Sequence, residues 1–350
     1  MNLRTLGRTG LRVSALGFGC MRLPMDGPKV DDRRAIPLLR RAVELGVTYF
    51  DTAVGYCQGD SQRALGDALH DLRGRIVLST KNPEKDPSEA DAWWKNLETS
   101  LRLLRTDHVD VYHSHGLSWA AFTKGLQGKG GLLEAWLKAR EQGLIRHIAF
   151  SSHDAAQNIM KLADEGVFES VTLQYNLLNR EHESAIAYLK EKNMGVVVMG
   201  PVGGGRLANQ TLEGQAGGAT SAELALKFVL SNPGVTVALS GMSDMAMLEE
   251  NVAVASRALA LSKDEEAEVG RASAAQVKLL DYYCTACGYC LPCPSGVDIP
   301  ENFTLIQMDQ AYGLTELARR RYADTKGRAR FCLECGTCLD KCPFNAVLKV

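Results

Sequence analysis

The sequence has no surplus of charge of either sign. Its 40 Lys and Arg residues nearly balance 41 Asp and Glu residues, which leaves a formal net charge of −1. A chain this close to neutral offers no electrostatic attraction for nucleic acid or for an anionic membrane. No apolar run approaches the roughly 18 residues of a membrane-spanning helix, and the first residues lack the features of a secretory leader. We therefore expect a soluble globular protein in a reducing cytoplasm, with neither nucleic acid nor membrane as partner.

Cysteine is scarce over most of the chain. Only Cys20 and Cys57 precede residue 284, and we expect both to be packing residues without a metal role. The other eight cysteines form two runs near the C-terminus, and each run closes with Cys-Pro. The runs are Cys284, Cys287, Cys290 and Cys293, followed by Cys332, Cys335, Cys338 and Cys342.

The spacing of these runs is typical of iron–sulfur ligands. Three thiolates at C-x2-C-x2-C spacing can bind three irons of one cubane, and in two-cluster ferredoxins the fourth Cys ligates the partner cluster. The sequence therefore predicts two [4Fe–4S] clusters with crossed ligands. One is expected on Cys284, Cys287, Cys290 and Cys342, and the other on Cys332, Cys335, Cys338 and Cys293.

Two other uses of cysteine compete with this prediction. Paired C-x2-C motifs also describe structural zinc sites, and eight cysteines would fill two of them. Zinc, however, has no need for triple runs that end in Cys-Pro. Disulfides fit poorly because nothing in the sequence suggests export. The first run is one residue shorter before Cys293 than the second run is before Cys342, so the crossing of Cys293 is the less regular part of the pattern.

Short β-branched runs alternate with amphipathic helical stretches up to about residue 275. The expected strands are 15–19, 47–51, 75–81, 108–115, 146–152, 170–175, 195–199 and 235–240, and the expected helices are 32–45, 61–72, 88–105, 132–142, 155–165, 181–192, 221–231 and 245–256. Eight such units in about 250 residues predict a (β/α)8 barrel. A doubly wound sheet is the alternative, but no Gly-x-Gly-x-x-Gly follows the first strand.

The remaining residues predict a second, smaller domain. We place the boundary between a barrel at 1–275 and a mainly helical, ferredoxin-like iron–sulfur domain at 276–350. A helix near 262–280 is expected to lead into it, and apolar residues at helical spacing predict a helical spacer over 299–322. The basic residues from Arg319 to Arg330 form either a solvated helix end or a docking patch for an acidic electron carrier.

Four polar residues at expected strand ends form a candidate catalytic set: Asp51, Tyr56, Lys81 and His115. In a barrel these ends meet at one face, where active sites are built. A lysine cation beside a tyrosine is expected to lower the pKa of that tyrosine, and a histidine can polarise a carbonyl oxygen. Asp51 and Lys81 could instead be an ordinary ion pair. His113 is expected one layer deeper, as a hydrogen-bonded core histidine.

The chain resembles the aldo-keto reductase family over about residues 1–260, and within it the subgroup with a C-terminal ferredoxin-like domain. The motifs that carry the resemblance are the opening segment from Leu6 to Pro24, Asp51-Thr52-Ala53 through Tyr56, Leu173 to Asn176, and Gly241-Met242 followed by Glu250-Asn251. The resemblance implies that Asp51, Tyr56, Lys81 and His115 are the catalytic tetrad. It also implies that NADPH, or less often NADH, binds in extended form across the barrel mouth.

The cofactor site implied by the resemblance is spread over several strand ends. Its expected residues are Gly19, Cys20, Met21, Asp51, Ser151, Ser152, Gln174, Met199, Pro201, Gly203, Leu207, Gly241, Glu250 and Asn251. Met199 replaces the aromatic residue that usually stacks on the nicotinamide. Gly241 and Met247 stand where the family has basic residues for the 2′-phosphate, so both NADP and NAD remain open as the cofactor.

These observations lead to two functional hypotheses. The first is an NAD(P)H-dependent oxidoreductase that reduces an aldehyde or ketone, or catalyses the reverse reaction, with Tyr56 as general acid and base and with clusters that transfer electrons or support the fold. The second is an electron-transfer protein whose barrel docks a redox partner protein. Trp119 and Phe122 either line an apolar substrate wall or pack a long loop.

Overall fold

The computed structural model describes residues 1–127, 131–177, 179–203, 221–257, 259–276, 284, 289–312 and 315–342. Eight parallel strands form a closed barrel in chain order, which confirms the predicted fold. The strands are β3 (Leu16–Gly19), β6 (Tyr49–Asp51), β7 (Val77–Asn82), β8 (Val109–Ser114), β9 (Ile145–Ser152), β10 (Ser170–Gln174), β11 (Gly195–Met199) and β12 (Val237–Ser240).

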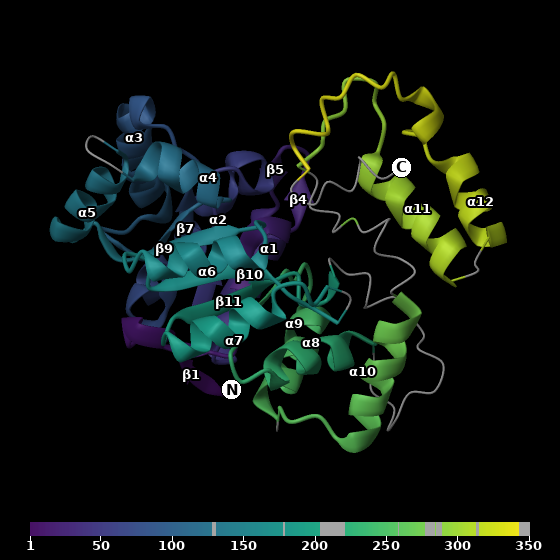
Figure 1. The fold of residues 1–350 in the computed structure, drawn as a ribbon, viewed down its shortest axis with the longest axis horizontal. Coiled ribbons are helices and arrows are strands. Elements are labelled where there is room, and N and C mark those ends of the chain that lie inside the picture. Colours follow the sequence, from purple (N-terminus) through teal and green to yellow (C-terminus); the bar gives the residue numbers. More distant parts are fainter. Residues whose placement is uncertain are drawn as a thin grey trace.

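Helices surround the barrel, as Figure 1 shows. They are α1 (Asp32–Glu44), α2 (Ser61–Leu69), α3 (Ala90–Leu104), α5 (Leu133–Glu141), α6 (Ala156–Asp164), α7 (Glu183–Glu191), α8 (Ser221–Ser231) and α9 (Met245–Ser256). Each lies within three residues of its predicted bounds. None of the described helices combines the length and apolar character needed to cross a membrane.

An N-terminal hairpin, which the sequence did not predict, closes one end of the barrel. It pairs β1 (Leu3–Thr5) with β2 (Arg12–Ser14). Its apolar residues Leu6 and Val13 are fully buried and pack with the residues that line the barrel interior. The turn approaches β11 so closely that a Cβ on Gly7 would lie 2.2 Å from the backbone nitrogen of Gly195. The opposite end, where the strands terminate, is therefore left for the functional residues.

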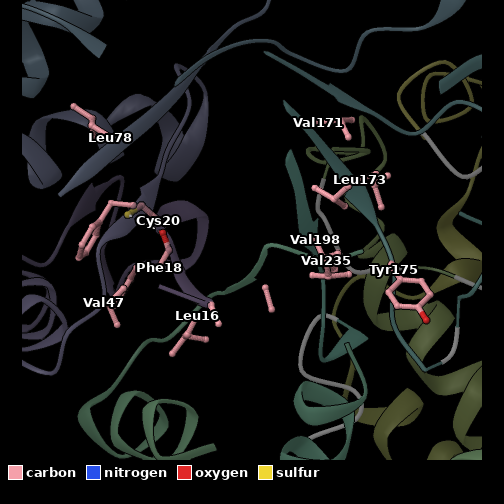
Figure 2. Packing of buried hydrophobic residues seen from close by; sticks show 14 of the residues in the cluster. Leu16, Phe18, Cys20, Val47, Leu78, Val171, Leu173, Tyr175, Val198 and Val235 are labelled. Atoms are coloured by element: carbon pink, nitrogen blue, oxygen red, sulfur yellow. Dashed lines mark hydrogen bonds between the residues drawn. The ribbon is translucent and has the colours of Figure 1, made fainter. Parts of the chain in front are cut away.

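The core has an inner and an outer layer because successive strand residues face opposite sides. In β11, Val197 belongs to the inner cluster, whereas Val196 and Val198 pack outward beneath the helices. Figure 2 shows labelled members of the outer cluster, with Phe18 and Cys20 in one group and Val198 in another. Fully buried Cys20 thus packs in the outer layer.

The C-terminal domain is helical, but its spacer is not one helix. The helical spacer predicted over 299–322 is present as α11 (Ile299–Tyr312) and α12 (Thr315–Asp324), which pack against each other. Gly313 lies between them in the sequence, and glycine is a poor helix former. Asn302 joins α11 to the following loop by donating to the carbonyl of Gly327 at 2.8 Å and accepting from the backbone of Ala329 at 2.9 Å.

The segment before the first cysteine run forms α10 (Lys263–Gln276). It is tied to the barrel by the ion pair of Lys227 in α8 with Glu265, at 2.7 Å. The expected continuation of this helix to Leu280 lies outside the described residues.

Candidate active site and cysteine cluster

Lys81 and Asp51 form a buried ion pair at the ends of β7 and β6. The ammonium nitrogen lies 2.5 Å from Oδ2 of Asp51 and also donates to the carbonyl of Thr52 at 2.8 Å. The side chains are only 1% and 2% exposed. Desolvating two charges is costly, and a buried pair persists only when further hydrogen bonds satisfy its remaining atoms. Ser79 supplies one by donating to Oδ1 of Asp51 at 2.8 Å.

His113 extends this polar network across the barrel interior. Its Nδ1 lies 3.3 Å from Oγ of Ser79, and its Nε2 lies 3.2 Å from Oγ1 of Thr172. Since Ser79 donates its single hydroxyl proton to Asp51, Nδ1 carries the histidine proton and Nε2 accepts from Thr172. Burial holds the pKa of His113 well below its usual value. His113 is therefore the hydrogen-bonded core histidine that the sequence predicted.

Tyr56 follows β6 and lies beside the ion pair, with Nζ of Lys81 4.7 Å from its ring centroid. The pKa of Tyr56 is raised well above its usual value, first by burial and then by the charge of Asp51. The net shift is thus opposite to the lowering expected from Lys81. The ammonium charge is balanced by Asp51 at 2.5 Å, so the loss of hydration dominates at the phenol. Tyr56 accordingly keeps its proton at neutral pH.

His115 comes directly after β8, and its backbone N–H donates to the carbonyl of Asn82 at 2.9 Å. Its ring meets that of Tyr56 edge to face, with centroids 5.9 Å apart. Burial, with the nearby cations Lys81 and Lys85, lowers the pKa of His115 to about 3. The imidazole is therefore neutral at physiological pH and presents one donor and one acceptor nitrogen.

The nicotinamide residues expected from the sequence lie at neighbouring strand ends. Ser151 in β9 is 3% exposed, and its hydroxyl accepts from the backbone of Gly116 at 2.9 Å. The hydroxyl of Ser152 donates to the carbonyl of Leu117 at 2.7 Å and accepts from the backbone of Asp154 at 3.1 Å. Ser151 thus retains a proton to donate, whereas the hydroxyl of Ser152 is committed to the adjacent loop.

The turn after β11 packs its glycine backbone closely against the side chain of Gln174. A Cβ on Gly200 would lie 2.7 Å from Nε2 of Gln174, and Gly200 has a left-handed φ of +64°. Its carbonyl accepts from the amide of Asn176 at 2.8 Å. Gly203 closes the turn by donating to the same carbonyl at 3.0 Å, with a φ of +60°. Pro201 between them is buried, half-buried Met199 ends β11, and Leu207 lies outside the described residues.

The first turn, after β3, also reaches the barrel mouth. Gly19 pairs in register with Asp51. The carbonyls of Cys20 and half-buried Met21 each accept from the thiol of Cys57 at 3.5 Å. Since the side chain of Cys20 packs in the outer layer, this turn presents its backbone to the mouth.

The residues expected near the adenosine end lie at β12 and α9. Asn251 donates to Oγ of Ser240 at 3.1 Å, and Gly241 and Glu250 are exposed. A Cβ on Gly241 would lie 3.3 Å from Cδ of Arg22. The side chain of Arg22 therefore packs beside Gly241, one of the two positions where the sequence lacks the basic residue expected for a 2′-phosphate. The signal that was missed is its position directly after the Gly19–Met21 turn.

Cysteines from the two runs meet in the C-terminal domain. The pKa of Cys338 is raised by burial and then by the charges of the nearby Cys332, Cys293 and Cys335. Cys293 belongs to the first run and the others to the second, so the fold brings both runs together. Within the described part of the chain, no three His, Cys, Asp or Glu side chains already form a closed metal site.

The other four cysteines are less completely defined. Cys290 is 9% exposed, and Cys284 and Cys342 are half-buried. Cys287 lies outside the described residues.

Tyr289, which was not among the residues predicted from the sequence, lies at the candidate catalytic residues. Its hydroxyl is 3.5 Å from Nε2 of His115, and the two ring centroids are 6.5 Å apart. A hydrogen bond from Tyr289 also acts on the pKa of Tyr56, in the lowering direction. The available signal was an aromatic residue directly before Cys290, but the 174 positions between His115 and Tyr289 conceal the contact in the sequence.

The aromatic residues of the loop after β8 belong to its packing. Phe122 is 1% exposed, stacks on Trp119 with centroids 6.0 Å apart, and meets Phe168 at 5.7 Å. Lys161 covers the Trp119 ring at 5.6 Å. Of the two roles considered for Phe122, the structure supports loop packing.

Comparison with known proteins agrees with this architecture. A model of the aldo/keto reductase family matches residues 15–220, and a model of the 4Fe-4S dicluster domain matches residues 283–347. An uncharacterized oxidoreductase of Bacillus subtilis, YqkF, is 27% identical, with 73% of this chain and 91% of that protein covered. L-galactose dehydrogenase of Arabidopsis thaliana is 28% identical, with 76% of this chain and 92% of that protein covered.

Solved structures give the same result. The holo form of aldo-keto reductase AKR11C1 from Bacillus halodurans superimposes with a TM-score of 0.67 at 27% identity, covering 78% of this chain and 96% of that one. An aldo/keto reductase from Klebsiella pneumoniae, solved with NADP and acetate, gives a TM-score of 0.64 at 26% identity. That match covers 77% of this chain and 94% of the other.

Proposed function

The chain belongs to the aldo/keto reductase family, and on that basis we propose that it is an NAD(P)H-dependent reductase of aldehydes or ketones that also catalyses the reverse oxidation. The observation that carries the proposal is the convergence of Tyr56, His115 and the buried Lys81–Asp51 pair at one end of the barrel. These groups come from three different strand ends, where barrel enzymes build their active sites.

In this proposal the substrate carbonyl oxygen lies between the hydroxyl of Tyr56 and the imidazole of His115. Tyr56, which is protonated at neutral pH, donates its proton to that oxygen as negative charge develops there. The neutral ring of His115 supplies a hydrogen bond that orients the carbonyl. As the Tyr56 oxygen loses its proton, the ammonium of Lys81 stabilises the resulting charge. In the alcohol-oxidising direction Tyr56 accepts the proton.

The residues at the barrel mouth fit a nicotinamide dinucleotide. The bound nicotinamide would supply the hydride for the carbonyl carbon. Ser151 and Gln174 would hold its carboxamide, and the turn from Gly200 to Gly203, with a positive φ at both glycines, would face the pyrophosphate. Arg22 at Gly241 provides a cation suited to a 2′-phosphate, and this supports NADP, the molecule bound in the Klebsiella pneumoniae relative.

The cysteines fit two [4Fe–4S] clusters, and we keep the crossed ligand sets as part of the proposal. The proximity of Cys338 to Cys293, Cys332 and Cys335 supports one of them. The other set comprises Cys284, Cys287, Cys290 and Cys342. Such clusters would supply one-electron transfer or a structural cross-link. Thiolate ligands of this kind suit a reducing cytoplasm.

The electron-transfer alternative receives less support. It rests on the basic residues between Arg319 and Arg330 as a docking patch for a redox partner. In the structure Arg321 is paired with Glu301 at 2.8 Å and Arg319 with Glu316 at 3.4 Å, both within the same domain. Arg328 donates to the carbonyl of Thr325 at 3.0 Å. Much of the basic character is thus used locally.

Replacing Tyr56 with Phe tests the proposed function. NADPH and NADH oxidation is measured anaerobically with a panel of aldehydes and ketones, and cofactor binding is followed separately by protein fluorescence. The change should lower kcat by roughly 10²- to 10⁴-fold, the usual effect of removing a general acid, and should leave cofactor affinity unaltered. Tyr188→Phe is the matched control, because the hydroxyl of Tyr188 meets exposed Asp164 and Lys192, which are not part of the candidate site. Full turnover by the Tyr56→Phe variant would refute the assigned acid.

A further inference from the structure

Tyr289 reaches from the first cysteine run to the catalytic residues of the barrel. It directly precedes Cys290 in the sequence. Its hydroxyl lies 3.5 Å from Nε2 of His115 and is hydrogen-bonded to Tyr56. These are the two groups that the proposed mechanism assigns to the substrate carbonyl oxygen, so the Tyr289 hydroxyl already lies beside both of them.

We propose that Tyr289 is a specificity-determining residue of the active site, contributed by the cysteine-rich domain, whose hydroxyl competes with the substrate oxygen for Tyr56 and His115. The inference rests on the proposed function. A carbonyl substrate must displace the phenol before it can accept a hydrogen bond from either group. A substrate binds only if its own contacts are worth more free energy than the Tyr289 contacts that it displaces. Substrates that bind more weakly than this are excluded.

The placement of Tyr289 favours a displaceable contact. The 3.5 Å separation from His115 is at the limit of a hydrogen bond. The side chain is still 36% exposed, so its movement into solvent does not require unpacking of a core. The ring meets the His115 ring at 72° rather than stacking on it. Cys290, the next residue, is 9% exposed and anchors the backbone, so the displacement needed is a movement of the Tyr289 side chain.

The competition predicts a specific kinetic change. In Tyr289→Phe the ring remains but the competing hydroxyl is lost, so KM for 4-nitrobenzaldehyde should fall by roughly two- to tenfold, the value of one neutral hydrogen bond. The kcat should stay within about twofold, because Tyr56, Lys81 and Asp51 are unchanged. Tyr322→Phe is the matched control, since its hydroxyl meets only the backbone of Arg330, at 3.4 Å, within the same domain.

A second measurement tests the contact without relying on turnover. Diethylpyrocarbonate acylates accessible neutral imidazoles, and peptide mass spectrometry gives the rate at each histidine. Tyr289→Ala should raise the rate at His115 several-fold. The rate at His147, which is paired with Glu169 at 2.9 Å in another part of the barrel, should not change. Equal iron content and absorbance of the variants and the parent protein establish that the C-terminal domain is intact.

Three outcomes would overturn the inference: an unchanged KM in Tyr289→Phe, a fall in kcat at constant KM, or an unchanged labelling rate of His115 in Tyr289→Ala. The fall in kcat would make Tyr289 a residue that assists catalysis. If the parent protein reduces no carbonyl, the proposed function fails, and the competition fails with it. Faster labelling of His115 in Tyr289→Ala would then still establish that Tyr289 covers this histidine.

Discussion

Replacing Asp51 with Asn should strongly destabilise the barrel. The change keeps the shape of the side chain but leaves the ammonium of Lys81 without its counter-ion, in a site where both residues are at most 2% exposed. Lys81 would retain only the carbonyl of Thr52, at 2.8 Å. Removing one partner of a buried ion pair costs about 3–5 kcal/mol, because an uncompensated charge remains. Such a loss is a large part of the 5–15 kcal/mol typical of a folded domain.

Urea unfolding followed by tryptophan fluorescence measures this loss. All four tryptophans lie between residues 93 and 136, so the signal reports on the barrel and not on the C-terminal domain. The double variant Asp51→Asn with Lys81→Met removes the stranded charge and should recover most of the lost free energy of unfolding.

The control for this experiment is Glu44→Gln, which breaks the exposed pair with Arg41 at 3.0 Å. It should cost less than about 1 kcal/mol, as surface pairs do. If Asp51→Asn costs no more than this control, or if the double variant is less stable than Asp51→Asn, the reasoning about the buried pair is refuted.

Two further predictions concern pH and iron. Because the pKa of His115 is lowered to about 3, kcat/KM for carbonyl reduction should show no imidazole limb between about pH 5 and 8; a limb near 6.5 that disappears in His115→Gln would contradict this. The pKa of His115 is thus lower in the folded chain than the value of about 6.5 expected in the unfolded chain. Its contribution to the free energy of unfolding is therefore fully present above about pH 6.5 and should be lost as the pH falls from there towards 3. Cys293→Ala should reduce iron from about eight to about four atoms per chain on anaerobic analysis if Cys293 ligates one of two clusters, whereas unchanged iron would exclude it as a required ligand.

The barrel was predictable because its pattern is local. Each strand and helix shows its own period in the sequence, and β11, α8 and α9 have the predicted bounds. The N-terminal hairpin was missed because β1 and β2 have three residues each, too few to show a period. The break between α11 and α12 was also missed, although Gly313 was a visible signal.

The candidate site, like the fold, was predictable from the sequence only in part. The sequence determined which residues stand at the strand ends, so Asp51, Lys81 and His115 could be identified without coordinates. It also determined the cysteine spacing that predicts two clusters. These features depend on order along the chain and on the chemistry of each side chain.

Only the tertiary structure decided how these groups act on one another. It showed that Asp51 balances the charge of Lys81, so the raising effect of burial on the pKa of Tyr56 outweighs the lowering effect of the cation. It also brought Tyr289 to His115 across 174 positions. Electrostatic and hydrogen-bond energies depend on distance and solvent exposure in space, and neither quantity is written in the order of the residues.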